Sequence, residues 1–308
     1  MALTVTKRSS VASWSSRVRA RWRDASVAWI WIGPAVLLVA AFLFYPMINT
    51  IWSSFFNADT TRFVGVANYR QIFTNASMLE VLRNNLLWLV LGTAATVIFG
   101  LLIAVLADRV RIESIVKAAI FIPMAISFVS AGVIWKFVYQ YAPPGQTQIG
   151  LLNAIITRLG FPPQPWLINP AINNFALIAV YVWMWTGFCM VILSAALKSV
   201  PEEILEAARV DGAGEISIFF RIIVPMISPT IAVVATTMVI NVLKIFDIIY
   251  VMTGGDFGTN VVALEYYQQL FTYNDFGLAS AFAVLLLLAI VPVMIVNIRR
   301  FRVQEARR

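Results

Sequence analysis

A charged segment between two long apolar runs, residues 199–225, holds the residues whose types and spacing best fit a chemical role. We call it the polar segment. Pro201, followed by two glutamates, predicts the start of a helix, because proline fits the first helical position and carboxylates complement the helix dipole there. Gly212 and Gly214 are predicted to break this helix, and a second short helix is predicted over residues 215–223.

Four residues near the middle and end of the first predicted helix suit contact with another protein. Ala207 and Ala208 are small and leave a helix face that a partner can approach closely. Glu206 and Asp211 offer charge-assisted hydrogen bonds to such a partner. The alternative interpretation is a simple connector, a surface helix that joins two membrane spans.

Side chains for enzymatic chemistry are scarce in this sequence. It contains no histidine, and its only cysteine, Cys189, lies within an apolar run, where we interpret it as packing. These counts exclude disulfide frameworks, thiolate metal clusters and chemistry that depends on histidine as a zinc ligand or general base. Because no nucleophile–base constellation is visible either, we predict that the chain is not an enzyme and holds no metal or cofactor of its own.

Three polar residues interrupt an apolar run in the last third of the sequence. Asn241, Lys244 and Asp247 follow one another at intervals of three, which places them near one face of a helix. Ionisable groups at membrane depth are costly and usually face a cavity or a partner. We interpret them either as a Lys244–Asp247 ion pair that serves packing or as a face that lines a translocation path. A proton- or sodium-coupled carrier using these two charges is an alternative function.

The composition indicates an all-α polytopic membrane protein. Of the 308 residues, 60% are hydrophobic and 12% are charged, whereas soluble domains carry about 25% charged residues. Several apolar runs reach the roughly 20 residues that a helix needs to cross a bilayer. The basic residues cluster at the ends of these runs, which the positive-inside rule explains without a nucleic-acid partner.

Six transmembrane helices are predicted, with both termini in the cytoplasm. They form a permease domain over residues 27–298, between basic tails at residues 1–26 and 299–308, and the predicted spans are residues 27–55, 85–107, 115–139, 174–197, 226–252 and 276–298. Of the 23 Lys and Arg residues, the two tails hold 6 and 5, and residues 108–117 and 198–221 hold 3 each. The three opposite loops hold 3, 2 and 0 when Lys136 is counted with the second loop, and Lys244 lies inside a span. This asymmetry predicts that the polar segment is cytoplasmic.

The spacing within the polar segment resembles the EAA motif of ABC-importer permeases. The matching residues are Glu206-Ala207-Ala208, Gly212, Ile222 and Val224-Pro225. Asp211-Gly212-Ala213 also resembles the form of the motif found in importers of sugars. Val224 stands where leucine is usual, which is a conservative departure.

The resemblance extends from about residue 29 to residue 302 and is to carbohydrate-importer permeases of the maltose type. It rests on Pro46 and on residues 53–55 (SSF), 64–69 (VGVANY) and 246–255 (FDIIYVMTGG). The proline expected after the two glycines is absent, with Asp256 in its place. Two stretches are most similar to α-glucoside importers, residues 123–128 (PMAISF) and 254–259 (GGDFGT).

This resemblance implies a type I ABC-importer permease fold in the cytoplasmic (inner) membrane of a bacterium. Two permeases, expected as a heterodimer, would form the pore above two copies of an ABC ATPase, and an extracytoplasmic sugar-binding protein would deliver the carbohydrate. ATP and Mg²⁺ would bind the ATPase, and this chain agrees in lacking a GxxxxGK[ST] phosphate loop. The residues expected to couple to the ATPase are Glu206, Ala207, Ala208, Asp211, Gly212 and Ala213.

A sugar offers hydroxyl groups and flat C–H faces, so its site needs amide or carboxylate groups beside aromatic rings. In maltose-type permeases the sugar contacts lie on the corresponding parts of the fourth and fifth spans. We therefore expect substrate contacts at Trp183, Thr186, Gly187, Asn241 and Ile245. Tyr181, Trp183 and Trp185 equally fit an interfacial aromatic belt.

Overall fold

The computed structural model describes residue 29 and residues 31–108 and 110–305. It consists of two units, residues 1–53 and residues 54–308, and the predicted N-terminal tail lies outside the described residues. In the first unit, Trp31–Ser53 is a helix of 23 residues, about 35 Å long at 1.5 Å per residue and therefore able to cross a bilayer. It contains a π-helical turn, η1 (Ala40–Phe44), and ends as α2 (Tyr45–Ser53).

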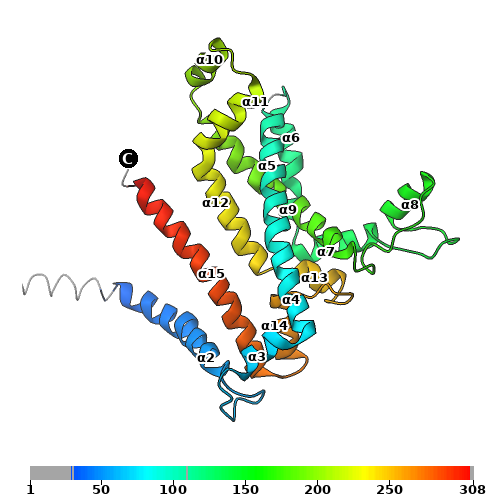
Figure 1. Cartoon of the computed structure of the whole chain (residues 1–308), viewed down its shortest axis with the longest axis vertical. Helices are drawn as coiled ribbons and strands as arrows, with labels where there is room; N and C mark the ends of the chain where they lie inside the picture. The colour runs from blue at the N-terminus through cyan, green and yellow to red at the C-terminus, as the bar shows by residue number, and fades with distance from the viewer. Residues whose placement is uncertain (1–28, 30, 109, 306–308) are drawn as a thin grey trace, which may run out of the picture. The chain divides into compact units, whose positions relative to one another are not determined.

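The second unit is built from helices and loops, and its described residues contain one isolated β-bridge, between Phe56 and Phe63. Figure 1 shows α10 at one end of this unit and α3 and α14 towards the other end. The elements in chain order are α3 (Ala67–Thr74), α4 (Ala76–Leu87), η2 (Trp88–Gly92), α5 (Thr93–Ala107), α6 (Glu113–Phe121), η3 (Ile122–Ala125), α7 (Phe128–Val138), α8 (Leu151–Arg158), α9 (Asn173–Lys198), α10 (Glu202–Val210), α11 (Glu215–Ile218), η4 (Phe219–Ile223), α12 (Val224–Leu243), α13 (Asp247–Met252), α14 (Val262–Phe271) and α15 (Phe276–Glu305).

The described helices agree with a polytopic membrane protein. Those of the second unit that are long and apolar enough to cross a membrane are Ala76–Ala107, Asn173–Lys198, Glu215–Leu243 and Phe276–Asn297. A bent pair, Glu113–Ala125 and Phe128–Val138, passes the same test when taken together. With the helix of the first unit, the described residues hold five candidate spans, or six if the bent pair is one span. The exact number of spans and the side of the termini stay predictions.

The third predicted span, residues 115–139, is wrong as a single straight helix. The chain bends by 100° between its two helices, α6 with η3 and α7. Pro123 lies in the 3₁₀ turn η3, and Ile126 is extended, with a φ of −91° and a ψ of 145°. Ser127 then caps α7, because its hydroxyl accepts a hydrogen bond from the N–H of Ser130 at 3.1 Å. A new helix therefore starts where the sequence continues as an apolar run.

The fifth predicted span, residues 226–252, also contains a break. α12 ends at Leu243, and the backbone leaves the helical region at Lys244 (φ −103°, ψ 15°) and Phe246 (φ −144°). α13 begins at Asp247. The prediction that Asn241, Lys244 and Asp247 lie on one helix face is therefore wrong.

The break turns isoleucine side chains into the core instead. Ile245 is 5% exposed, and Ile248 and Ile249 are fully buried in one cluster with residues of α7 and α9. Lys244 is exposed and Asp247 is half-buried, and no ion pair joins them within the described part of the chain. The ion-pair interpretation of these two charges is therefore wrong.

Two of the π-helical turns each lie just before a proline. η1 ends at Phe44, two residues before Pro46, and η4 ends at Ile223, two residues before Pro225. A proline has no N–H for the carbonyl four residues earlier, and its ring crowds that carbonyl, so the preceding turn widens. Through η4, the predicted short helix of residues 215–223 continues directly into α12 as one helix, Glu215–Leu243.

The core of the second unit lies where α5, α9 and α12 pack together. Cys189 is fully buried there beside Val97 of α5 and Met238 of α12, so its interpretation as packing is confirmed. Trp88 and Tyr181 are also buried and meet edge-on, with ring centroids 5.9 Å apart. Because lipid tails are as apolar as these side chains, van der Waals packing rather than the hydrophobic effect holds such helices together in a membrane.

Candidate functional site

Backbone chemistry defines both ends of α10, the first helix of the polar segment. Pro201 precedes α10 in an extended conformation, and proline there removes no helical hydrogen bond. Gly212 follows α10 with a φ of +83°. The N–H groups of Gly212 and Ala213 donate to the carbonyls of Arg209 and Ala208, each at 3.0 Å. This is a Schellman motif, and the prediction that Gly212 ends the helix is confirmed.

An ion pair joins α10 to the start of α11. The Nε atom of Arg209 lies 2.8 Å from an Oε atom of Glu215, and the two side chains are about half exposed. The hydrogen bond from Arg209 to the Glu215 carboxylate raises the pKa of the Arg209 guanidinium. Exposed pairs of this kind contribute little to stability, so the pair orients the turn rather than anchoring α10 to the helices below it.

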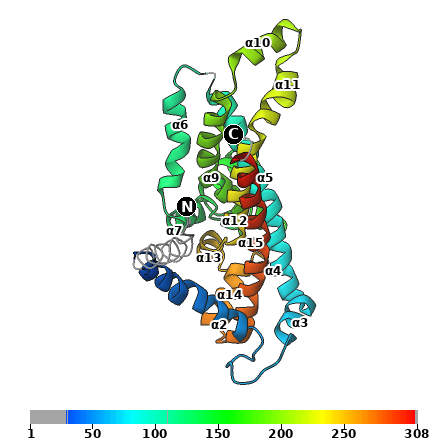
Figure 2. The ribbon, with the colours of Figure 1, turned by 90° about the vertical axis from the view of Figure 1, so that its left-hand side faces the viewer.

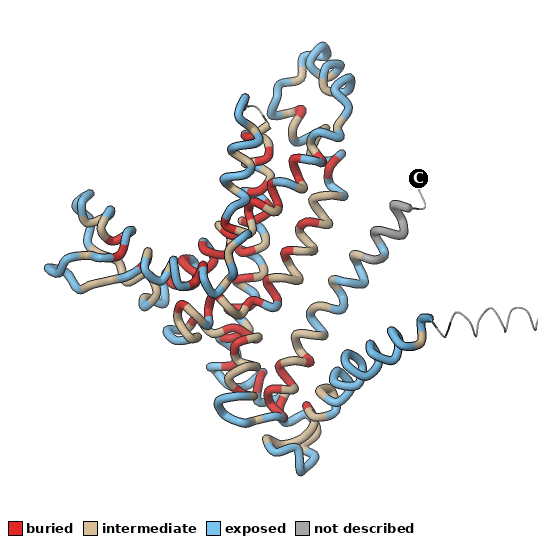
Figure 3. The backbone as a smooth tube through the Cα atoms, turned by 180° about the vertical axis from the view of Figure 1, so that it is seen from behind, coloured by how far each residue is buried: buried red, intermediate tan, exposed pale blue. Residues whose placement is uncertain are grey.

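The six residues expected to couple to a partner lie together on this protruding element. The exposed ones are Glu206, Ala207, Asp211 and Gly212, and the half-buried ones are Ala208 and Ala213. No residue of α10 is buried. Figure 2 shows α10 and α11 at one end of the second unit, and Figure 3 shows that α10 is largely exposed, whereas buried positions concentrate on α5, α9 and α12. Their role in coupling stays a prediction.

Two exposed apolar side chains lie beside these residues and were not singled out from the sequence. Val210 is 87% exposed at the end of α10, and Ile216 is 77% exposed in α11. Ile204, in the first turn of α10, is also exposed. Apolar groups gathered on a small, charged, protruding element are typical of a protein-interaction surface. The signal in the sequence was an apolar residue, Val210, between the charged Arg209 and Asp211.

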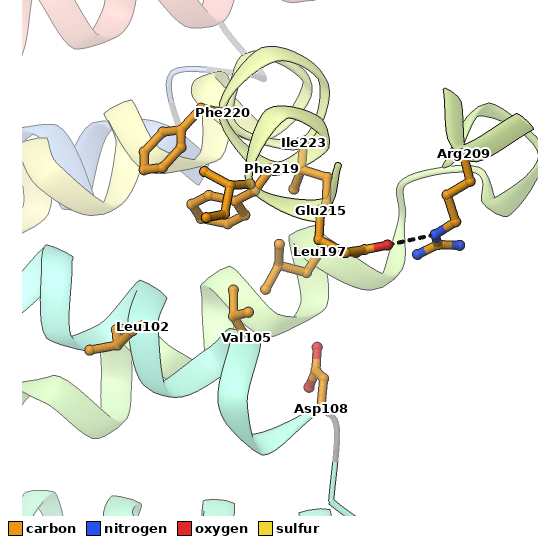
Figure 4. Close-up of a pocket in the computed structure, with 10 residues that line it drawn as sticks. Leu102, Val105, Asp108, Leu197, Arg209, Glu215, Phe219, Phe220 and Ile223 are labelled. Atoms are coloured by element: carbon orange, nitrogen blue, oxygen red, sulfur yellow. Dashed lines mark hydrogen bonds and ion pairs between the residues drawn. The ribbon is translucent and has the colours of Figure 1, made fainter. Parts of the chain in front are cut away.

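A pocket of about 430 Å³ lies between the ends of α5 and α9 on one side and α11 with the π turn η4 of the polar segment on the other. Figure 4 shows Val105 and Leu197 on the α5 and α9 side and Phe219 on the η4 side. The Arg209–Glu215 pair lies at one edge of this pocket. The lining is mostly apolar, and its charged residues are Asp108, Arg209 and Glu215.

A network of charged groups ties three helices together at the same end of the second unit. Lys117 of α6 lies 2.5 Å from the carboxylate oxygens of both Asp108, at the end of α5, and Glu113. Lys117 also donates to the hydroxyl of Ser194 in α9, and that hydroxyl donates to Asp108 at 2.8 Å. Lys198, the last residue of α9, pairs with Glu113. The sequence showed these residues only as charges that flank spans.

Asn241 and Ile245, expected at the substrate site, lie at the end of α12 and in the break after it. Asn241 is half-buried, and its side-chain amide donates to the carbonyl of Thr237 in its own helix at 2.9 Å. Ile245 is buried in the core. The Asn241 side-chain oxygen can accept a hydrogen bond from a ligand that approaches this flank of α12. Substrate binding by Asn241 and by Ile245 stays a prediction.

Trp183 and Thr186 line a different space, a concavity of about 990 Å³ between α5, α6 and α9 that we call the apolar hollow. Trp183 packs edge-on against Trp135, with ring centroids 5.5 Å apart. The Thr186 hydroxyl donates to the carbonyl of Val182 at 2.6 Å, so its donor is used within α9. Asn241 and Ile245 do not line this hollow, and the structure therefore does not bring the five expected substrate residues together.

Gly187 and Tyr181 are packing residues of α9 in this structure. A Cβ atom on Gly187 would lie 2.6 Å from the carbonyl oxygen of Ile120, so glycine lets α9 approach α6 closely. Substrate contact at Gly187 stays a prediction. Tyr181 is 1% exposed and its hydroxyl lies 4.0 Å from the sulfur of Met238. The interpretation as an interfacial aromatic belt is therefore wrong for Tyr181.

Comparison with known proteins places the chain among transport proteins. Residues 96–302 match the family model described as binding-protein-dependent transport system inner membrane component. The osmoprotective compounds uptake permease protein GgtC of Synechocystis sp. is 57% identical over 276 residues, which cover 90% of this chain and 99% of that protein. The alpha-glucoside transport system permease protein AglF of Rhizobium meliloti is 47% identical over 272 residues, which cover 88% of this chain and 81% of that protein.

The fold agrees with solved transporters. A chain of a bacterial ABC transporter that imports the acidic polysaccharide alginate superposes with a TM-score of 0.77 at 22% identity, covering 92% of this chain and 99% of that one. The relatives are permease subunits of transporters and not enzymes. The family model covers more than half of the sequence, and the chain belongs to the family of binding-protein-dependent transport system inner membrane components.

Proposed function

We propose that this chain is the permease subunit of an ATP-driven importer of a carbohydrate, an α-glucoside or another oligosaccharide. The observation that carries the proposal is the exposed α10, whose EAA-type residues lie on one protruding element closed by a glycine turn. The matched relatives support it, since several bear names of sugar transport permeases, for alpha-glucosides, trehalose and maltose, and arabinooligosaccharides.

In this proposal α10 lies in the cytoplasm and binds an ABC ATPase, while both chain termini are also cytoplasmic. Glu206 faces a basic residue of the ATPase, and the small Ala207 lets the helix seat closely. The exposed Val210 adds an apolar contact. Closure of the ATPase dimer then moves the spans as rigid bodies between inward- and outward-open states.

The partners we propose are a second, different permease, two copies of the ATPase and an extracytoplasmic sugar-binding protein in the inner membrane system of a bacterium. ATP and Mg²⁺ bind the ATPase, and this chain contributes half of the pore. The family description, which names a binding-protein-dependent transport system, supports these kinds of partner. A similar solved chain belongs to an alginate transporter in complex with its periplasmic protein.

The two relatives quoted above are named for different substrates, osmoprotective compounds and alpha-glucosides. We therefore propose to reconstitute the complete transporter, co-expressed with its partner subunits, in proteoliposomes. Uptake of labelled maltose, trehalose and sucrose is compared with uptake of glycine betaine, with and without ATP. ATP-dependent uptake of at least one sugar supports the proposal.

Two results would contradict the proposal. Uptake of glycine betaine alone would overturn the carbohydrate assignment. Sugar uptake that persists without the ATPase and collapses with an ionophore would overturn the ATP-driven mechanism and favour a secondary carrier.

A further inference from the structure

A second concavity lies at the end of α9 remote from the polar segment, and we call it the aromatic hollow. It measures about 530 Å³ and lies between α7, the loops on either side of α8, and α13 with the loop that follows it. Its lining includes Lys136, Gln140, Tyr141, Tyr250, Thr253 and Phe257. Its volume is within the roughly 300–1,000 Å³ typical of small-molecule sites.

The loop after α13 is shaped by unusual backbone conformations. Gly254, Gly255 and Gly258 all have positive φ, and so does Phe257, at 57°. A bulky side chain is rarely found in this region, and residues held there are concentrated at functional sites. The loop therefore keeps Phe257 in a costly conformation.

Buried amide side chains from two other helices hold this loop in place. Asn173 of α9 donates to the carbonyl of Phe257 at 2.7 Å. Asn84 of α4 and Asn174 of α9 donate to the carbonyl of Gly258 at 2.8 Å and 3.1 Å. These three asparagines are at most 8% exposed. Because the loop is fixed by buried hydrogen bonds, a ligand that contacts Phe257 meets a preorganised surface.

The groups left accessible in the aromatic hollow suit a neutral sugar. Phe257 is 49% exposed, so it offers a ring to the flat C–H face of a pyranose. Tyr250 is 46% exposed and stacks one ring face on Phe246, with centroids 5.1 Å apart, so at most its other face meets a ligand. Lys136 has its ammonium 3.4 Å from the carbonyl of Val251, a long contact that leaves N–H donors for hydroxyl groups. Gln140, which is exposed, adds an amide.

The charge of the lining argues against a cationic ligand. Lys136 is its only charged residue, and the lining contains no carboxylate. Aromatic cages for quaternary ammonium groups rely on the attraction between a cation and ring faces, which a neighbouring lysine opposes. A betaine-like osmoprotectant is therefore a poor fit, whereas a polyhydroxylated neutral molecule is a good one.

We propose that the aromatic hollow is a sugar-binding subsite, separate from the expected contacts at Trp183 and Asn241, which receives the carbohydrate at the entrance of the path. This inference rests on the proposed function. α9 has 26 residues and is about 39 Å long, and its first residue, Asn173, contacts the loop that carries Phe257. The hollow thus lies a membrane thickness away from the polar segment, on the outer side in the orientation proposed above.

The test uses the complete transporter in lipid nanodiscs and the best-transported sugar among labelled maltose, trehalose and sucrose. Phe257→Gly removes the ring at a position whose φ suits glycine, so the fold is retained, and Tyr250→Ala removes the second ring. Tyr273→Ala is the matched control, because Tyr273 is an exposed aromatic residue just after α14 and outside the lining. Sugar binding without the binding protein, the half-saturation concentration for uptake and the stimulation of ATPase activity by the binding protein are measured for each variant.

We expect Phe257→Gly and Tyr250→Ala to weaken sugar binding and to raise the half-saturation concentration roughly tenfold each, which is the loss of one good ring contact. For the control variant, sugar affinity and the half-saturation concentration for uptake should stay within about twofold of the wild-type values. Glycine betaine should not displace the bound sugar.

Three results separate the possible failures. Unchanged binding and uptake in both variants, with the wild type transporting sugar, would overturn the subsite and leave the proposed function standing. Unchanged sugar binding with a loss of ATPase stimulation by the binding protein would also overturn it, since the hollow would then dock that protein. A wild type that transports no sugar would overturn the proposed function itself, and the subsite with it.

Discussion

Replacing Gly212 by alanine tests whether the left-handed turn after α10 is needed for the polar segment to work. The φ of Gly212 is +83°, and a Cβ atom added there would meet no atom within 4 Å. Because the substitution clashes with nothing, it acts only through the backbone, where the left-handed conformation costs a residue other than glycine roughly 1–2 kcal/mol. A cost of that size lowers the population of the closed turn about 5- to 30-fold.

Gly214 provides a matched control two residues further along. Its φ is −71° with a ψ of 153°, which any residue adopts, and a Cβ atom added there also meets no atom within 4 Å. Gly214→Ala should therefore leave the turn intact. Gly212→Asn should fall between wild type and Gly212→Ala, because asparagine enters the left-handed region more readily than alanine.

The assay combines hydrogen exchange with transport in the reconstituted transporter. The amide of Ala213 is bonded to the carbonyl of Ala208, so its exchange reports directly on the turn. In Gly212→Ala we expect this exchange to rise about 5- to 30-fold, in line with the local free energy lost, and ATP-dependent uptake to fall. If Gly212→Ala and Gly214→Ala give the same exchange and the same uptake, the reasoning about this turn is wrong.

Three further predictions concern the coupling residues, the charged network and the substrate path. Glu206→Lys should abolish ATP-dependent uptake with a normal amount of protein in the membrane, and normal uptake would remove Glu206 from the coupling surface. Lys117→Met should lower the free energy of unfolding by about 1–2 kcal/mol, because two carboxylates lose their shared partner. Lys198→Met removes a side chain that is 55% exposed and should lower it by less than about 1 kcal/mol. Unfolding of the two variants in detergent compares these losses, and equal losses would contradict the greater importance of Lys117 in the network. Trp183→Ala and Asn241→Ala should each change the uptake rate or sugar preference while the transporter still assembles, and unchanged kinetics in both would place neither on the path.

The sequence allowed α10 and its glycine turn to be predicted because their determinants are local. Proline before a helix and glycine after it act through their own backbone geometry. The EAA-type spacing added the expectation that Glu206 and its neighbours couple to an ATPase, which stays a prediction. The structure places these residues and the turn at Gly212 on one protruding element.

Features that depend on distant packing could not be predicted in the same way. The helix breaks at Lys244 without a glycine or proline to mark the position, and isoleucine side chains beyond the break are buried in the core. Ser194 and Lys117 meet across 77 positions of sequence, a pairing that no local pattern reveals. The five expected substrate residues were assigned to two spans, and the packing of α12 against α9, which the sequence does not reveal, leaves Asn241 outside the hollow that Trp183 and Thr186 line.

The continuous helix Glu215–Leu243 connects the polar segment to this break. Its 29 residues give a rod about 44 Å long, with the π turn η4 near one end and Lys244 at the other. α10 is joined to this rod by the short turn after Val210, which the Arg209–Glu215 pair bridges. A mostly apolar pocket lies between η4 and the ends of α5 and α9, whereas the Lys117 network joins α5, α6 and α9 at the same end of the second unit. The helix Glu215–Leu243 is therefore the element that links α10 to the break at Lys244, and its α12 part packs with α5 and α9 in the core.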